Sequence, residues 1–241
     1  MTTEEMMNPN KTARVAGLLY LIIALLGIFS LFFGPESLIA PGDAAATANN
    51  IKDSESLYRL AFIGDLIGQV IFIFLVLLLY KLLKPVNKNL AVLMVVLVLV
   101  GVPIAMLNDL NQIAALLLSR GADYLPVFAA DQLHAHVMLF LELYESGLRI
   151  AYIFWGLWLF PLGYLVFKSG FLPRILGILL IIAGLGYLIE FVAYFLLPNL
   201  DLTIRMFTFW GEVILALWLL IKGVNVEQWE KRALESSRSL I

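Results

Sequence analysis

Six long apolar runs constrain this chain more than any other feature of its sequence. Crossing the roughly 30 Å hydrocarbon layer of a bilayer takes about 20 apolar residues of α-helix. Runs of this length are found at residues 13–34, 58–82, 90–118, within 131–167, at 173–197 and at 202–221. Buried helices of soluble proteins are normally shorter. The sequence therefore predicts an all-α, polytopic membrane protein, built as a six-transmembrane-helix bundle.

The composition agrees with this class and excludes several others. Of the 241 residues, 62% are hydrophobic and 14% are charged, whereas an ordinary soluble domain has roughly 25% charged residues. This excludes a soluble globular enzyme. Cysteine is absent, which excludes disulfides, thiolate metal sites and cysteine nucleophiles. Because the net charge of −2 gives no signal for a polyanion, we expect no nucleic acid partner.

Lysine and arginine residues near the ends of the runs indicate the orientation, because they are retained on the cytoplasmic side of a membrane. Eleven of the 16 basic residues fall on one side of the membrane, and Arg149 lies within a run. The other side receives four, which are Lys52, Arg59, Arg120 and Arg205. We therefore expect both termini to be cytoplasmic. The tails are residues 1–12 and 226–241, and the transmembrane domain is 13–225.

The segment after the first run allows an alternative interpretation. The run could be a signal peptide cleaved at Ala44-Ala45-Ala46. We favour a retained span, because the run is longer than a typical signal core and Pro41-Gly42-Asp43 precedes the alanines. Asp43 is also suited to cap a short helix within the loop 35–57.

The stretch 131–167 is too long for one span, because about 37 helical residues extend about 55 Å. It must be tilted, broken or partly outside the membrane. Gly147, Gly156 and Pro161 offer places for a bend, since Gly and Pro weaken the helical hydrogen-bond ladder. Residues 131–144 then form either an interfacial helix or an outward extension of the span.

Polar residues within the runs are the candidate functional residues, since such groups are costly in a bilayer and usually face the bundle interior or a water-filled cavity. They are Asp65, Gln69, Asn108, Asp109, Asn111, Glu142, Glu145, Arg149, Glu190 and Glu212. Depth can be counted along each helix from the residue at its cytoplasmic end. Asp65 and Glu190 then lie about 24 Å from the inner edge of the membrane, Asp109 and Arg149 lie about 28 Å from it, and Glu212 lies near the midplane. Five runs thus bring polar groups to the outer third of the membrane, and the first run contributes nothing comparable.

These residues allow functional and structural interpretations. Glu145 precedes Arg149 by four residues, the favourable arrangement for a helical ion pair. The pair could line a ligand site or neutralise itself at the membrane boundary. Asp65 and Gln69 share the same spacing. The polar residues 108–112 could instead be interhelical hydrogen-bonding groups that hold spans together.

The spacing does not support a metal site. His134, Glu142 and Glu145 include suitable ligand types and share one face if 131–149 is a continuous helix. Neither His-Glu-x-x-His nor the Glu-x-x-His pattern of di-iron bundles is present. Phosphate-binding Gly-rich loops, dinucleotide fingerprints and nucleophile elbows are also absent from the sequence. We therefore assign no metal, no cofactor and no catalytic residue.

Four segments together resemble a known family. They are the Ala-rich 40–51 (APGDAAATANNI), Tyr58-Arg59-Leu60 with Asp65, 83–87 (LKPVN) and 169–177 (SGFLPRILG). This pattern is similar to a mostly bacterial membrane family, domain of unknown function forty-three eighty-six. The resemblance covers about residues 13–197. It implies a compact multi-span bundle in a prokaryotic inner membrane and no particular activity or ligand.

The leading functional hypothesis is a protein that binds, and possibly moves, a small or lipid-like ligand through an outward-facing polar cavity. Carboxylates at such depth can exchange protons or hold a cation, and Arg149 could orient an anionic group. The expected partners are membrane lipids and this small-molecule or lipid ligand. A non-catalytic structural or regulatory subunit is the alternative. A membrane-embedded enzyme that uses carboxylates or a metal is less favoured.

Overall fold

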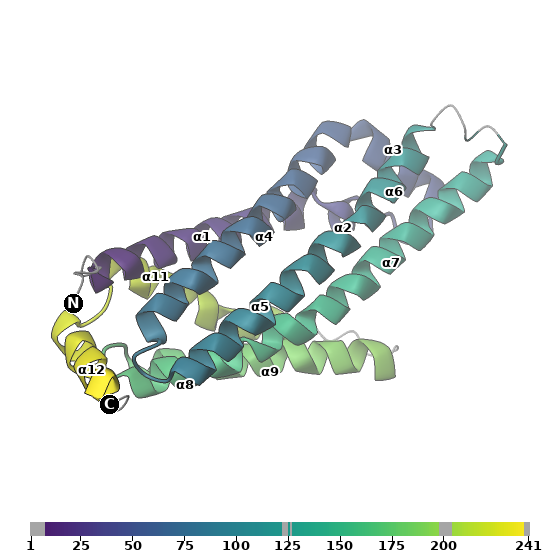
Figure 1. The fold of residues 1–241 in the computed structure, drawn as a ribbon. Coiled ribbons are helices and arrows are strands. Elements are labelled where there is room, and N and C mark those ends of the chain that lie inside the picture. The colour runs from purple at the N-terminus through teal and green to yellow at the C-terminus, as the bar shows by residue number, and fades with distance from the viewer. Residues whose placement is uncertain (1–7, 122–124, 126, 198–203, 239–241) are drawn as a thin grey trace. The chain divides into compact units, whose positions relative to one another are not determined.

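The computed structural model describes residues 8–121, 125, 127–197 and 204–238 of the chain. Every regular element within these ranges is an α-helix (Figure 1). The all-α prediction is therefore confirmed. The helices are α1 (Pro9–Phe33), α2 (Pro35–Leu38), α3 (Ala44–Asp53), α4 (Glu55–Leu83), α5 (Lys88–Asn108), α6 (Leu110–Arg120), α7 (Ala130–Leu157), α8 (Leu159–Ser169), α9 (Arg174–Leu196), α10 (Arg205–Thr208), α11 (Trp210–Ile221) and α12 (Val226–Arg238).

Several of these helices are long and apolar enough to cross a membrane. In the described part of the chain, five stretches meet this criterion: Pro9–Leu38, Glu55–Leu83, Lys88–Arg120, Ala130–Ser169 and Arg174–Leu196. A sixth is reached only if Met206–Ile221 and Val226–Ser237, which are bent by 101° at their junction, count as one span. The first two residues of the expected run 202–221 lie outside the described residues. The apolar helices fit a membrane protein, whereas the count of six and the orientation stay predictions.

Two of the long stretches are interrupted where the sequence carries a signal. Of the alternatives expected for 131–167, which were a tilted, a broken or a partly external helix, the structure shows an interruption at Trp158, between Gly156 and Pro161, within the single apolar stretch Ala130–Ser169. Residues 131–144 continue into the rest of α7 as an extension of the same helix. The expected run 90–118 lies within one apolar stretch, Lys88–Arg120, in which the regular helix is interrupted at Asp109.

A proline precedes this second interruption. Pro103 lies inside α5, where it has no N–H for the helical ladder and its ring crowds the preceding turn. Asp109 then occupies the N-cap position of α6, in a right-handed helical conformation and without a side-chain cap hydrogen bond. Its carboxylate instead accepts a hydrogen bond from the side chain of Gln112, three residues further along.

The predicted helix of the loop 35–57 is confirmed. It is α3, and the side chain of its N-cap residue Asp43 accepts a hydrogen bond from the backbone nitrogen of Ala46 at 2.8 Å. The C-terminal tail forms α12, where Asn225 Oδ1 accepts from the backbone nitrogen of Gln228 at 3.1 Å. Both caps satisfy amide groups that lack a partner within a first helical turn.

The chain divides into two compact units. Unit 1 comprises Met1–Ile22, Ile71–Val102 and Tyr152–Ile241, and unit 2 comprises Ile23–Val70 and Pro103–Ala151. Each unit thus combines segments that are distant in the sequence. The core of unit 2 joins α3, α4, α6 and α7 through Ala48, Ile51, Tyr58, Ala115, Leu116, Val137 and Leu141.

Unit 1 is held together by a close approach of α8 and α9. A methyl group added at Gly163 would lie 2.7 Å from the carbonyl oxygen of Gly177, and one at Gly156, near the end of α7, would lie 2.9 Å from that of Gly184. Because glycine has no side chain, the two helix backbones can approach so closely that an added methyl group would not fit. In the same unit, α12 is fastened to the end of α4 by Trp229, whose indole Nε1 donates to the carbonyl of Leu82 at 2.8 Å.

Candidate functional site

We use the term acid–amide cluster for four polar side chains of unit 2: Asp65 and Gln69 on α4, Asp109 between α5 and α6, and Gln112 on α6. Gln112 bonds to one of the two acids, because its Nε2 donates to Asp109 Oδ1 at 3.2 Å. Ser30 Oγ on α1 donates to Asp65 Oδ2 at 3.0 Å. Each acid therefore accepts a hydrogen bond from a neutral donor.

A buried tyrosine fixes α6 against α4 beside this cluster. Tyr58 is fully buried, and its hydroxyl donates to the backbone carbonyl of Gln112 at 2.9 Å. This bond restrains the backbone from which the Gln112 side chain extends. The backbone position of Gln112 is thus set by a contact that lies within the packed core of unit 2.

The cluster has more acceptor oxygens than donors. Gln69 Oε1, Asp109 Oδ2 and Gln112 Oε1 are buried and have no hydrogen-bond partner among the described residues. Gln112 is 0% exposed and Asp109 is 5% exposed. A buried polar group that lacks its partner costs about 1–3 kcal/mol. Because all three atoms are acceptors, the group that would satisfy them must supply hydrogen-bond donors or positive charge.

The neighbouring asparagines hold helices together. Asn108 Nδ2 donates to the backbone carbonyl of Tyr144 at 2.8 Å, which connects α5 to α7. Asn111 Nδ2 in turn donates to Asn108 Oδ1 at 3.0 Å. This is the interhelical bonding that amide side chains provide within membranes. Asn108 and Asn111 therefore lie beside the acid–amide cluster and act as packing contacts.

The remaining candidates on α7 lie at the edge of unit 2. The expected ion pair is confirmed, because Arg149 Nη2 lies 2.9 Å from Glu145 Oε1. Glu142 is exposed and His134 is half-buried. No group of three or more His, Cys, Asp or Glu side chains in the described ranges could hold a metal ion.

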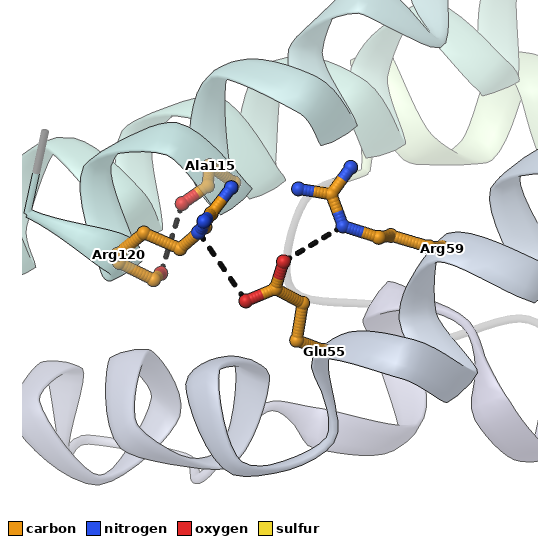
Figure 2. Close-up of polar contacts among 5 residues, drawn as sticks. Glu55, Arg59, Ala115 and Arg120 are labelled. Atoms are coloured by element: carbon orange, nitrogen blue, oxygen red, sulfur yellow. Dashed lines mark hydrogen bonds and ion pairs between the residues drawn. The ribbon is translucent and has the colours of Figure 1, made fainter.

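A second ion-pair network joins the start of α4 to the end of α6. Figure 2 shows Glu55 between two guanidinium groups, with Arg59 Nε at 2.8 Å and Arg120 Nε at 3.3 Å from its carboxylate oxygens. Both arginines are more than two-fifths exposed, so this network contributes little to stability. It does bring together Arg59, near the start of α4, and Arg120, at the end of α6.

Unit 1 contains the other two candidates, Glu190 and Glu212. Glu190 is buried at 3% exposure. Glu212 accepts hydrogen bonds from two tyrosine hydroxyls, Tyr20 at 2.5 Å and Tyr187 at 3.2 Å. The ring of Tyr20 also packs against Trp158, as does that of Phe72. The Glu212 carboxylate is therefore held by donors from α1 and α9.

The expectation that the first run contributes nothing comparable is wrong. Tyr20 and Ser30, both on α1, donate to the carboxylates of Glu212 and Asp65. An inventory restricted to ionisable and amide side chains omits hydroxyl groups, although hydroxyls are strong donors to a carboxylate. The same omission applies to Tyr58 and Tyr187. Gln69, expected to pair with Asp65, instead has an unpartnered Oε1, and Asp65 accepts a hydrogen bond from Ser30.

An all-helical chain with several bilayer-length apolar helices and carboxylates buried among them has the architecture of an integral membrane protein. The chain belongs to the family described as "Domain of unknown function (DUF4386)", whose model matches residues 15–223. It is also similar to an "Uncharacterized protein" of Archaeoglobus fulgidus, with 37% identity over 150 residues, which are 62% of this chain and 75% of that protein. No solved structure matches the chain. The family resemblance inferred from the sequence is therefore confirmed.

Proposed function

We propose that this protein binds a small ligand at the acid–amide cluster of unit 2 and moves it across the membrane. The observation that carries the proposal is the set of buried acceptor oxygens on Gln69, Asp109 and Gln112. Polar groups within membrane-spanning helices are costly, and those that persist commonly mark ligand or ion pathways. A ligand with hydrogen-bond donors or positive charge would remove the cost that these atoms impose.

The cluster favours such a ligand over an anionic one. Asp65 and Asp109 carry acid groups, and neither makes an ion pair with Lys or Arg within the described part of the chain. An anion placed here would meet like charge and no opposing donor group beyond Ser30 and the Gln112 amide. Arg149, which could orient an anionic headgroup, is already engaged by Glu145.

We further propose a multi-pass topology in the cytoplasmic membrane of a prokaryote, with six spans and both termini cytoplasmic. The five apolar stretches and the bent pair support this count, and the excess of lysine and arginine on one side supports the orientation. Membrane lipids are then the surrounding partner.

Native mass spectrometry of the purified full-length protein tests the ligand proposal. The measurement compares the small-molecule adducts of the wild type with those of Asp109→Asn and Gln112→Leu. Glu145→Gln is the matched control, because it removes an acid of the same unit outside the cluster. We expect an adduct on the wild type and the control that is lost from both cluster variants.

Two results would contradict the proposal. One is a wild-type protein without any adduct from extracts that contain native membrane lipids and solutes. The other is an adduct retained in Asp109→Asn and Gln112→Leu. In either case the polar residues would be packing contacts, as Asn108 and Tyr144 already are, and a structural or regulatory subunit would become the better assignment.

A further inference from the structure

We propose that the turn between α8 and α9 binds the phosphate headgroup of an anionic phospholipid of the surrounding membrane. The inference goes beyond the proposed function, because it concerns unit 1 and uses no residue of the acid–amide cluster. The juxtaposition that carries it is a pair of exposed cations, Lys168 and Arg174, which lie against the same aromatic ring.

The ring of Phe167 holds the two cations at one place. Lys168 Nζ lies 5.9 Å and the guanidinium carbon of Arg174 lies 5.7 Å from the centre of this ring. Both distances are within the range in which an aromatic ring attracts a cation. Lys168 belongs to the last turn of α8 and Arg174 is the first residue of α9. The turn therefore presents positive charge from two helix ends together.

Hydrogen bonds fix the backbone of the turn. Ser169 Oγ accepts from the backbone nitrogen of Leu172 at 3.2 Å. The backbone nitrogen of Asn225, between α11 and α12, donates to the carbonyl of Phe171 at 3.2 Å. Ser169, Phe171 and Leu172 are all buried. The positions from which the two cations extend are thus set before a ligand arrives, which reduces the entropy lost on binding.

No acid compensates the two charges. The sequence contains no Asp or Glu in residues 146–189, and neither Lys168 nor Arg174 forms an ion pair within the described ranges. A third cation, Arg232 of α12, donates to the Lys168 carbonyl at 3.2 Å and is itself paired with Glu235 at 3.3 Å. The excess of positive charge favours an anion, and the guanidinium fork of arginine matches the oxygens of a phosphate.

The neighbouring surface is apolar, which favours a lipid over a soluble phosphate. Two of the apolar stretches that are long enough to cross a membrane meet at this turn, one on each side of it. Tyr164 precedes Lys168 by four residues and Ile178 follows Arg174 by four, so each cation shares a helix face with an apolar side chain. Tyr164 is 45% exposed and Ile178 is 42% exposed. A phospholipid would place its phosphate at the turn and its acyl chains along these side chains, as basic sites between membrane helices do.

Native mass spectrometry with added lipid tests this inference. The purified full-length protein is titrated with phosphatidylglycerol and, in parallel, with phosphatidylcholine of the same acyl chains, whose headgroup has no net charge. We expect the wild type to bind phosphatidylglycerol more tightly. Lys168→Gln and Arg174→Gln should each weaken phosphatidylglycerol binding about fivefold, the contribution of one basic residue beside an anionic lipid, and should leave phosphatidylcholine binding unchanged.

Lys11→Gln and Lys168→Arg are the matched controls. Lys11 is an exposed cation at the start of α1 in the same unit, so Lys11→Gln removes one charge without changing the turn. Lys168→Arg keeps the charge at the turn. Both controls should bind phosphatidylglycerol as the wild type does. Because the substituted side chains are exposed, gel filtration and thermal unfolding of all four variants should match the wild type.

Three results would overturn the inference. One is equal affinity of the wild type for the two lipids. Another is an equal loss of phosphatidylglycerol binding in Lys11→Gln and in the two turn variants, because the attraction would then be spread over the surface of unit 1. The third is displacement of the lipid by millimolar inorganic phosphate at constant ionic strength, because the site would then take a soluble anion. Asp109→Asn should keep the lipid, so this inference and the proposed function can fail separately.

Discussion

The contact between α8 and α9 provides a stability prediction whose size follows from the geometry. An added methyl group at Gly163 would lie 2.7 Å from the carbonyl oxygen of Gly177, 2.8 Å from Ile181 Cγ1 and 3.3 Å from the backbone nitrogen of Ile181. Rotation of a side chain can relieve only the second contact. The variant Gly163→Ala therefore forces the two helix backbones apart.

Two opposing effects determine the expected magnitude. Overpacking of a close contact costs about 1–3 kcal/mol, whereas replacing glycine by alanine inside a helix contributes up to about 1 kcal/mol of propensity. Gly27→Ala is the matched control, because an added methyl group there meets no atom within 4 Å. The propensity gain is common to both variants, so Gly163→Ala should be less stable than Gly27→Ala by the overpacking cost alone, about 1–3 kcal/mol.

Reversible unfolding in mixed micelles, titrated with a denaturing detergent, measures this difference. The free energies of unfolding of the wild type and both variants are compared under identical lipid conditions. Gly163→Ala should fall below the wild type, and Gly27→Ala should equal or exceed it. If the two variants unfold at the same detergent fraction, then α8 and α9 do not meet at the distance described and the reasoning is refuted.

Three further predictions concern single contacts. Tyr20→Phe should lower the unfolding free energy by about 1–2 kcal/mol, and Tyr187→Phe should lower it by less than about 1 kcal/mol. The reason is that the hydroxyl of Tyr20 is closer to the Glu212 carboxylate. Equal losses in parallel detergent titrations would contradict this. Trp229→Phe removes the bond to the Leu82 carbonyl, so the α12 amides should exchange hydrogen about tenfold faster while those of α9 do not change. Mass spectrometry of exchanged peptides measures both rates. An unchanged exchange rate in α12 would contradict the prediction. Arg120→Gln should lower the free energy of unfolding by less than about 1 kcal/mol, and by still less at high salt, because its ion pair with Glu55 is exposed. A loss of several kcal/mol in thermal unfolding would contradict this and would mean that the ion pair is shielded from water.

The apolar runs predicted most of the helices because length and hydropathy are local properties of the sequence. The helix α3 and the break near Trp158 were also predictable, since Asp43, Gly156 and Pro161 act on their immediate neighbours. The interruption at Asp109 was not predicted. Pro103 lies six residues before it, and its effect on the helix depends on how α5 and α6 pack within the bundle.

The sequence predicted the acids of the candidate site but not the groups that hydrogen-bond to them. Asp65 and Asp109 were found because an ionisable group in an apolar run is conspicuous. Ser30, the partner of Asp65, lies on another helix, and spacing along a single helix does not indicate which helices will be neighbours. The hydroxyl groups of Tyr20 and Ser30 were the missed signal, because each is a donor in an otherwise apolar run and requires an acceptor.

The two buried acid sites differ in how fully their oxygens are bonded. In unit 1 the Glu212 carboxylate receives two hydroxyl donors, from Tyr20 and Tyr187, as expected of an acid that holds helices together. In unit 2 Asp65 accepts from Ser30 and Asp109 accepts from Gln112, while Asp109 Oδ2 and the amide oxygens of Gln69 and Gln112 have no partner among the described residues. A packing role would select for the fewest unsatisfied atoms. The unpartnered acceptors in unit 2 are the atoms that the proposed ligand, with hydrogen-bond donors or positive charge, would satisfy.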